Sequence, residues 1–213
     1  MKCKPYSYRE VVKSDVSPLI HAINTLGENL IGLELGVCMA DSFLTIMHNC
    51  SIKKLYGIDH WKPYDDYLKY VPDGKPTYSV DEKKSQYHKM LALHNIKYSG
   101  SKHKAVIIEG DTLNVVKKFK DKSLDFIFFD STLSEEQTYE EAMAYYPKIK
   151  KGGLFLGHDA EAQIQIIEPL KKVLKHYNCK NKIFIYNNCF LIKIWKQNYI
   201  FQHRYIRLLM IGL

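Results

Sequence analysis

The sequence predicts a single α/β domain with a Rossmann-like, seven-stranded, mostly parallel sheet that has helices on both faces. Short apolar segments alternate with segments of helical periodicity along most of the 213 residues, and this alternation is typical of βαβ units with right-handed crossovers. The apolar segments are apolar on both faces, as expected for parallel strands covered by helices on both sides. The length suits one domain, residues 1–213, with a sizeable core.

Five of the expected strands end at or near an acidic residue. They are NLIGLEL (29–35), KKLYGI (53–58), AVIIEG (105–110), LDFIFF (124–129) and GLFLGH (153–158). The stretch KIFIYNNCFLIKIW (182–195) holds two more apolar runs joined at Asn187-Asn188, a pair typical of a hairpin turn. We therefore expect the last strand to run antiparallel to the others.

Helices are expected between these strands. The stretch 41–47 is short and partly apolar, and apolar residues recur at helical spacing over 113–119. The strongest pattern runs over 134–149, where the first residue and Gln137 have the spacing of a capping box. The pair Gly152-Gly153 is expected to interrupt the chain before the fifth strand.

Three segments lie outside this alternation. Residues 1–28 are expected to form an N-terminal helical segment, and 197–213 a C-terminal tail that docks on the domain or contacts a second copy in a homo-oligomer. Residues 62–98 begin as a loop rich in tyrosine and proline and continue as a helix from about residue 80 to 94. Long loops in compact domains are often functional, so we expect the acceptor side of the site there. His88, His94 and His103 are expected at the surface.

Composition limits the class of protein. No apolar window is long enough to span a bilayer and the N-terminus has no signal-peptide core, so a soluble cytoplasmic protein is expected. The five cysteines include no CxxC pair, which favours free thiols over a zinc site. The net charge of +8 is typical of a lysine-rich surface that aids solubility, or of attraction to a phosphorylated small molecule or nucleic acid.

Acidic residues cluster where a ligand is expected. In an open α/β sheet, ligands bind outside the carboxyl ends of the strands, and these ends carry Glu34, Asp59, Asp111, Asp130 and Asp159. A single acid after a strand is usually a turn or cap residue. Five at one edge would share a crevice of low dielectric constant, so their joint placement indicates a functional site.

The turn after the first strand indicates the type of ligand. It has one glycine, Gly36, followed by the small Ala40 and the polar Ser42. Dinucleotide-binding enzymes place three glycines here to approach a pyrophosphate. The single glycine therefore favours a ligand without a pyrophosphate and speaks against a nicotinamide oxidoreductase.

With these motifs the chain resembles the class I S-adenosylmethionine-dependent methyltransferases. It is most similar to the branch whose first motif reads E-x-G-x-x-x-G-x-S and whose fifth strand ends in G-G-x-x-x-x-H-D. Glu34, Gly36 and Ser42 match the first motif, while Ala40 replaces its second glycine. Residues 152–159 match the second motif, and the resemblance covers about residues 30–195.

The resemblance implies S-adenosyl-L-methionine as cofactor and assigns binding roles. The loop after Glu34 would wrap the methionine part. Asp59 would bind the ribose hydroxyls and His60 would touch the adenosine. Gly110 and Asp111 would contact adenine, with Asp111 accepting from its amino group. The remaining cofactor contact would come from Asp130. Tyr56, Trp61 and Phe129 are candidate walls for the sulfonium cation, or core aromatics.

The residues after strands four and five are candidates for catalysis. Asp130, His158 and Asp159 are candidate bases for the acceptor. Relatives often have a second acid or histidine directly after the strand-four aspartate, and some bind magnesium there, but this chain has Ser131-Thr132. Asp130 and Asp159 are still candidate Mg²⁺ ligands through bridging waters. Without a metal, His158 is the best general base by its ordinary pKa.

The most strongly indicated function is O-methylation of a small hydroxylated acceptor, such as a sugar or sugar derivative. One alternative is a nucleic-acid methyltransferase, which the positive charge favours, although the Asn/Asp-Pro-Pro-Tyr/Phe signature of base amino methylation is missing after strand four. A second alternative is a cofactor-binding fold without catalysis that serves as an interaction module.

Overall fold

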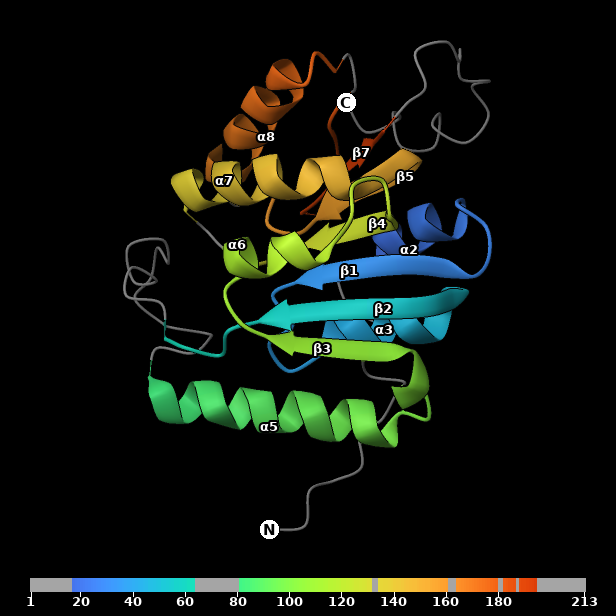
Figure 1. The fold of residues 1–213 in the computed structure, drawn as a ribbon, viewed down its shortest axis with the longest axis vertical. Helices are drawn as coiled ribbons and strands as arrows, with labels where there is room; N and C mark the ends of the chain where they lie inside the picture. Colours follow the sequence, from blue (N-terminus) through green and yellow to red (C-terminus); the bar gives the residue numbers. More distant parts are fainter. Residues whose placement is uncertain are drawn as a thin grey trace.

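The computed structural model describes residues 17–63, 81–131, 134–160, 164–179, 182–186 and 188–194. Within them lies a seven-stranded sheet of order β3-β2-β1-β4-β5-β7-β6 (Figure 1). The strands are β1 Leu30–Leu35, β2 Ile52–Asp59, β3 Ala105–Glu109, β4 Leu124–Phe129, β5 Ile149–Gly157, β6 Phe184–Tyr186 and β7 Cys189–Lys193.

The first five strands are parallel, and β7 runs antiparallel to both β5 and β6. The expected hairpin and antiparallel last strand are confirmed. Asn188 of its turn has the positive φ of 60° that asparagine tolerates. The strand order reverses at β1, which lies between β2 and β4, so the ends of β1, β2 and β4 meet at the position where open α/β sheets bind ligands.

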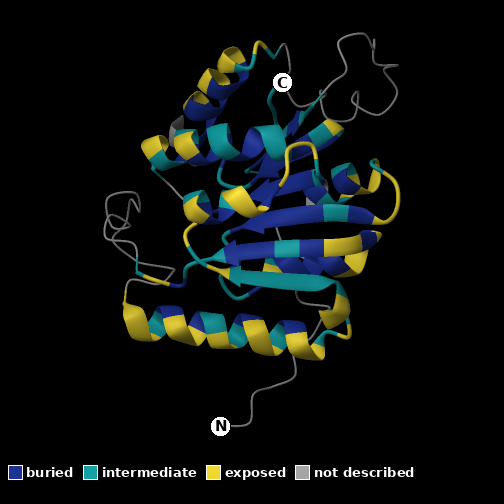
Figure 2. Ribbon diagram, viewed as in Figure 1, coloured by how far each residue is buried: buried dark blue, intermediate teal, exposed yellow. Residues whose placement is uncertain are grey.

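Helices cover both faces of the sheet. The reason is visible in β4, whose successive apolar side chains point alternately to the two faces. Phe126 and Phe128 of β4 pack into a core with helices α2, α3 and α5. Ile127 and Phe129 point the other way, into a core with α6, α7 and α8. The helices are α2 Ser17–Asn24, α3 Asp41–Asn49, α5 Glu82–Tyr98, α6 Thr112–Val115, α7 Glu135–Tyr145 and α8 Ile164–His176. Figure 2 shows the buried central strands and the exposed outer side of α5.

Two details of the predicted elements are wrong. The helix expected over 134–149 ends at Tyr145, after which Tyr146–Lys148 form a 3₁₀ turn with Pro147 near its start and Ile149 opens β5. An apolar residue at helical spacing fits a buried strand equally well, so periodicity placed Ile149 in the wrong element. Similarly, only residues 113–115 of the 113–119 stretch lie in an α-helix, which begins at Thr112 and continues as a 3₁₀ turn over Val116–Lys118.

The glycine pair 152–153 lies inside β5 and does not precede it. Leu124 pairs with Ile149 while Phe126 pairs with Leu154, so the register shifts between them. Gly152 has φ +90°, a conformation that costs glycine little. The pair therefore makes a bulge within the strand.

Several expectations fall partly or wholly outside the described residues: residues 1–16 of the N-terminal segment, 64–80 of the tyrosine-rich loop, Asn187 and the tail 197–213. In the described part, α5 extends to Tyr98, four residues beyond the expected end. Cys38, Cys50, Cys179 and Cys189 are free thiols. Among the described helices, none has both the length and the apolar character needed to cross a bilayer.

Candidate functional site

The site begins where the chain leaves β1. Gly36 has φ +86°, and a Cβ there would lie 2.0 Å from the backbone oxygen of Asp130. Its amide donates to the Ile58 carbonyl at 2.9 Å, and the Asp130 amide donates to the Leu35 carbonyl at 2.9 Å. Only glycine allows both the left-handed conformation and this close approach, so Gly36 brings the ends of β1, β2 and β4 together.

Glu34 lies beneath this turn and not at an open edge. Its side chain is fully buried, and the Ser42 hydroxyl donates to Oε1 at 2.5 Å. Burial raises the pKa of Glu34 well above its ordinary value, and the Ser42 hydrogen bond partly opposes this. The second oxygen, Oε2, is buried without a hydrogen-bond partner among the described residues.

Asp59, the last residue of β2, links two turns. Its Oδ2 accepts from the Cys38 amide at 2.8 Å and its Oδ1 from the Trp61 amide at 2.7 Å. Next to it, His60 is half-buried, and its Nδ1 accepts from the Lys62 amide at 2.8 Å. A carboxylate has about four lone-pair sites, so these bonds leave Asp59 capacity for a ligand.

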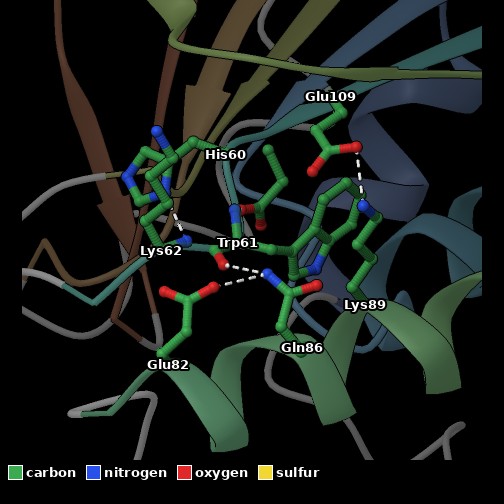
Figure 3. Close-up of polar contacts among 8 residues, drawn as sticks. His60, Trp61, Lys62, Glu82, Gln86, Lys89 and Glu109 are labelled. Carbon is green, nitrogen blue, oxygen red and sulfur yellow. Dashed lines mark hydrogen bonds and ion pairs between the residues drawn. The ribbon is translucent and has the colours of Figure 1, made fainter.

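Helix α5 holds the segment after β2 in place, as Figure 3 shows. Gln86 Nε2 donates to the Trp61 carbonyl at 3.3 Å, while Lys89 pairs with Glu109 at the end of β3 at 2.6 Å. Trp61 is buried, and its Nε1 donates to the Cys38 carbonyl at 2.8 Å. The His60 side chain points away from α5 in this view (Figure 3). The β1 and β2 turns are therefore fixed from the side of α5.

The expectation that His88 lies at the surface is wrong. His88 is buried, and its Nδ1 lies 3.7 Å from Cys38 Sγ. It packs on the motif that follows β1. The helix α5 has little hydrophobic asymmetry, with scattered lysines and exposed apolar residues, so its buried side was not evident from the sequence.

The candidate aromatic walls pack mainly in the cores. The Tyr56 ring lies edge-on to Phe119, with centroids 5.2 Å apart. Phe129 packs in the same way on Phe155 at 5.8 Å. Trp61 belongs to the opposite core. The alternative reading of these three residues as core aromatics is the one that the packing supports.

The turn after β3 is held by backbone contacts and leads into the short helix α6. The Gly110 amide donates to the Asp59 carbonyl at 2.9 Å, which fixes this turn to β2. Asp111 is exposed and caps α6, accepting from the Asn114 amide at 3.0 Å. The next residue, Thr112, lines the hollow of the site. Contact of Asp111 with adenine stays a prediction.

A hollow lies among the strand ends, lined by Gly36, Ile58, Asp59, His60, Thr112, Ser131, Gln137 and Glu141. Its floor centres on Glu141, which is fully buried. Thr112 Oγ1 donates to Oε1 of Glu141, Ser131 Oγ donates to Oε2, and Gln137 Nε2 donates to Oε1 at 2.9 Å. Burial raises the pKa of Glu141, and these three donors oppose the rise.

Glu141 was not among the predicted site residues, because Glu140-Glu141 looks like a charged helix surface. One signal could have found it. Glu141 lies four residues after Gln137 and directly before the buried Ala142, on the side of α7 that carries the apolar positions. A carboxylate at such a position needs buried donors, and Thr112 and Ser131 supply them.

Asp130, His158 and Asp159 meet where β4 and β5 end. Each offers one ligand atom, and the three atoms lie within 4.8 Å of one another. His158 Nδ1 lies 3.1 Å from Asp159 Oδ1. The structure thus brings together all three residues that the sequence indicated for catalysis.

Charge in this group is unevenly distributed. Burial would raise the pKa of Asp159, but the hydrogen bond and charge of His158 and a hydrogen bond from Asn188 lower it overall. Desolvation among the crowded strand ends, then the charge of Asp159, raise the pKa of Asp130 to about 7, with His158 opposing. Because the Asp130 side chain is solvent-exposed, its desolvation is partial. Asp159 is therefore the carboxylate that stays ionised.

Asn188, predicted from the sequence only as part of a hairpin turn, also contacts the site. Its Nδ2 donates to Asp159 Oδ1 at 3.2 Å, and its carbonyl accepts from the Ala160 amide at 2.9 Å. Asp159 has φ 61°, a left-handed conformation that costs a non-glycine residue energy. The β6–β7 hairpin therefore holds Asp159 in its orientation.

Comparisons with known proteins agree with this architecture. A family model described as a methyltransferase domain matches residues 31–160, while no curated protein matches. The O-methyltransferase from Bacillus cereus in complex with SAH has 12% identity and a TM-score of 0.57, covering 92% of this chain and 94% of that one. The O-methyltransferase NovP has 9% identity and a TM-score of 0.60, with 88% and 80% covered.

The fold does not fix the reaction by itself. Precorrin 8W decarboxylase from Methanobacterium thermoautotrophicum has 14% identity and a TM-score of 0.57, covering 91% of this chain and 92% of that one. At such identities the likeness shows the fold alone. The family match is independent of it and spans more than half of the chain. The chain therefore belongs to the methyltransferase domain family and is a class I S-adenosylmethionine-dependent methyltransferase.

Proposed function

We propose that this protein transfers the methyl group of S-adenosylmethionine to a hydroxyl group of a small acceptor, such as a sugar or sugar derivative. The observation that carries the proposal is the meeting of Asp130, His158 and Asp159 where β4 and β5 end, with ligand atoms within 4.8 Å of one another. Such a group suits removal of a proton from a hydroxyl that has been positioned for in-line attack.

The residues around the hollow suit the cofactor. Asp59 and His60 line it, and the spare lone pairs of the Asp59 carboxylate suit the two vicinal hydroxyls of a ribose. Glu34 places a buried carboxyl group beneath the turn after β1, with Oε2 lacking a partner among the described residues. A cationic ligand above this turn would favour the ionised form of this carboxyl group and be stabilised by its charge. When bound, S-adenosylmethionine supplies an electrophilic methyl group.

His158 is the proposed base. Its Nδ1 faces Asp159 Oδ1 at 3.1 Å, so the ionised Asp159 orients the ring and stabilises the positive charge that forms when His158 accepts a proton. Asn188 holds Asp159 from the other side. The proposed base lies next to Asp130, and its Nε2, the atom that would accept the proton, is buried in this structure.

A divalent cation is a further part of the proposal. Asp130 and Asp159 supply the oxygen ligands that Mg²⁺ prefers, and Mg²⁺ commonly retains several waters. The nearby imidazole of His158 suits transition metals better than magnesium. Among the described residues, the two carboxylates therefore fit Mg²⁺ as protein ligands, and a bound cation would lower the pKa of an acceptor hydroxyl.

Methyl transfer to a panel of sugars and sugar nucleotides tests this function. The purified protein is incubated with S-adenosylmethionine, with Mg²⁺ or with EDTA, and formation of S-adenosylhomocysteine is measured. We expect turnover on a hydroxylated acceptor, a loss of about 10²-fold or more in His158→Ala, and little change in His103→Ala as a surface control. Equal turnover of His158→Ala and the unaltered protein would contradict the role of His158.

A further inference from the structure

We propose that Glu141 makes the floor of the hollow a hydrogen-bond acceptor, so that the site selects adenine over a base with a carbonyl group at the same ring position. This inference rests on the proposed binding of an adenosine cofactor. It assigns the discrimination to two hydroxyl groups and to the buried carboxylate that orients them.

The hydrogen bonds of the Thr112 and Ser131 hydroxyl groups have a defined direction. Thr112 Oγ1 and Ser131 Oγ each donate to Glu141, and all three residues line the hollow. A hydroxyl has one hydrogen and two lone pairs, and an ionised carboxylate can only accept. Because each hydroxyl gives its hydrogen to Glu141, it can offer only lone pairs to a ligand in the hollow.

The two hydroxyls line the same hollow as Asp59. Asp59 lines the same hollow at the end of β2, where the ribose is proposed to bind. Thr112 follows β3, the neighbour of β2, and Ser131 follows β4, which is separated from β2 by β1. The base is bonded directly to the ribose, so a base that lies over this hollow would face the two hydroxyls. An acceptor floor suits the 6-amino group of adenine and repels a 6-oxo group.

Gln137 makes it possible to test the role of Glu141 by substitution. Its Nε2 donates to Oε1 of Glu141, the same oxygen that accepts from Thr112. In Glu141→Gln, the new amide oxygen is the only atom that can accept from these donors. The amide nitrogen then faces Ser131, whose hydroxyl must accept and turn its hydrogen toward the hollow. The substitution reverses the polarity of one floor group with almost no change in volume.

The experiment compares S-adenosylhomocysteine with its deaminated analogue, S-inosylhomocysteine, by calorimetric titration of the full chain. The variants are Glu141→Gln and Ser131→Ala, with Glu140→Gln, on the exposed side of the same helix, as the matched control. We expect the unaltered protein to prefer the adenine form by about tenfold or more, as for one or two hydrogen bonds. Both site variants should reduce this ratio by at least about threefold, and the control should preserve it.

The ratio of the two affinities shows whether Glu141 orients the hydroxyls or has a purely structural role. Loss of a purely structural role would weaken the binding of both analogues equally. Equal affinity of the unaltered protein for the two analogues would overturn the inference while leaving the proposed cofactor intact. An equal loss of both affinities in Glu141→Gln would also overturn it. Binding of neither analogue by the unaltered protein would overturn the proposed function together with the inference. Should Glu141→Gln fail to fold, the ratio in Ser131→Ala decides.

Discussion

Asn188 Nδ2 donates to Asp159 Oδ1 at 3.2 Å, joining the β6–β7 hairpin to the residue pair that follows β5. The Asp159 carboxylate thus lies between two side chains, because His158 Nδ1 faces the same oxygen at 3.1 Å. The antiparallel end of the sheet therefore contributes to the orientation of the proposed base.

Removing the Asn188 side chain tests this contribution. Asn188→Ala should lower kcat by about tenfold, because the loss of one hydrogen bond to a charged group is worth about 1.5–3 kcal/mol and Asp159 would orient His158 less well. Cofactor affinity should stay unchanged. Asn188→Gly controls for the positive φ of 60°, and should show the same loss. Full activity in both variants would exclude Asn188 as a positioning residue.

Asp59 is expected to dominate the affinity for the cofactor. Asp59→Ala should weaken binding of S-adenosylhomocysteine by about 2 kcal/mol or more, the cost of losing a charged acceptor. Part of that loss would come from the turns that Asp59 links through Cys38 and Trp61, so thermal melting is measured alongside. Glu136→Gln, an exposed acid on α7, is the control. Unchanged affinity in Asp59→Ala would remove it from the ribose site.

Gly36 should be far less tolerant of substitution than another glycine in the same conformation. Gly36→Ala and Gly100→Ala share a positive φ, of +86° and +77°, but only at Gly36 would the new Cβ lie 2.0 Å from backbone. Gly100→Ala should cost about 1–2 kcal/mol from the left-handed conformation alone. Gly36→Ala should cost several times more or prevent folding. Chemical denaturation compares them, and similar costs would contradict the close contact with Asp130.

The raised pKa of Glu34 predicts that the stability of the fold depends on pH. Its pKa is raised well above the ordinary value of 4.5, so the folded state holds a proton that the unfolded chain has lost. The stability that Glu34 contributes is complete below about pH 4.5 and declines as the pH rises through the folded pKa.

Glu34→Gln removes this proton linkage. The free energy of unfolding of the variant should therefore fall less between about pH 5 and about pH 8 than that of the unaltered protein. Denaturant titrations at the two pH values give the difference, with the exposed Glu28→Gln as control. Identical pH dependence in Glu34→Gln and the unaltered protein would mean that Glu34 is ionised in the fold at both values.

The sheet could be predicted from the sequence because its central strands contain short, largely apolar runs. LDFIFF in β4 has side chains in both cores, and no other element tolerates that pattern as well. The hairpin at Asn188 was equally clear. By contrast, Ile149 fits both the helical spacing and a buried strand, so the boundary between α7 and β5 required knowledge of the packing.

The site could be predicted only in part, for a similar reason. Acids at strand ends are visible in sequence, and Asp130, His158 and Asp159 do meet. The role of Glu141 depends on donors from Thr112 and Ser131, 29 and 10 residues away. Such partners come together only in the folded chain, and the residue types alone look like an ordinary charged helix.

Calorimetric titration with S-adenosylmethionine and S-adenosylhomocysteine, with NAD as control, tests the central claim most directly. The account predicts binding of both sulfur nucleotides with dissociation constants on the order of micromolar, about −8 kcal/mol, and no binding of NAD. Binding of NAD alone, or of none of the three, would contradict the assignment of the hollow between Gly36, Asp59 and Ser131 to an S-adenosyl cofactor.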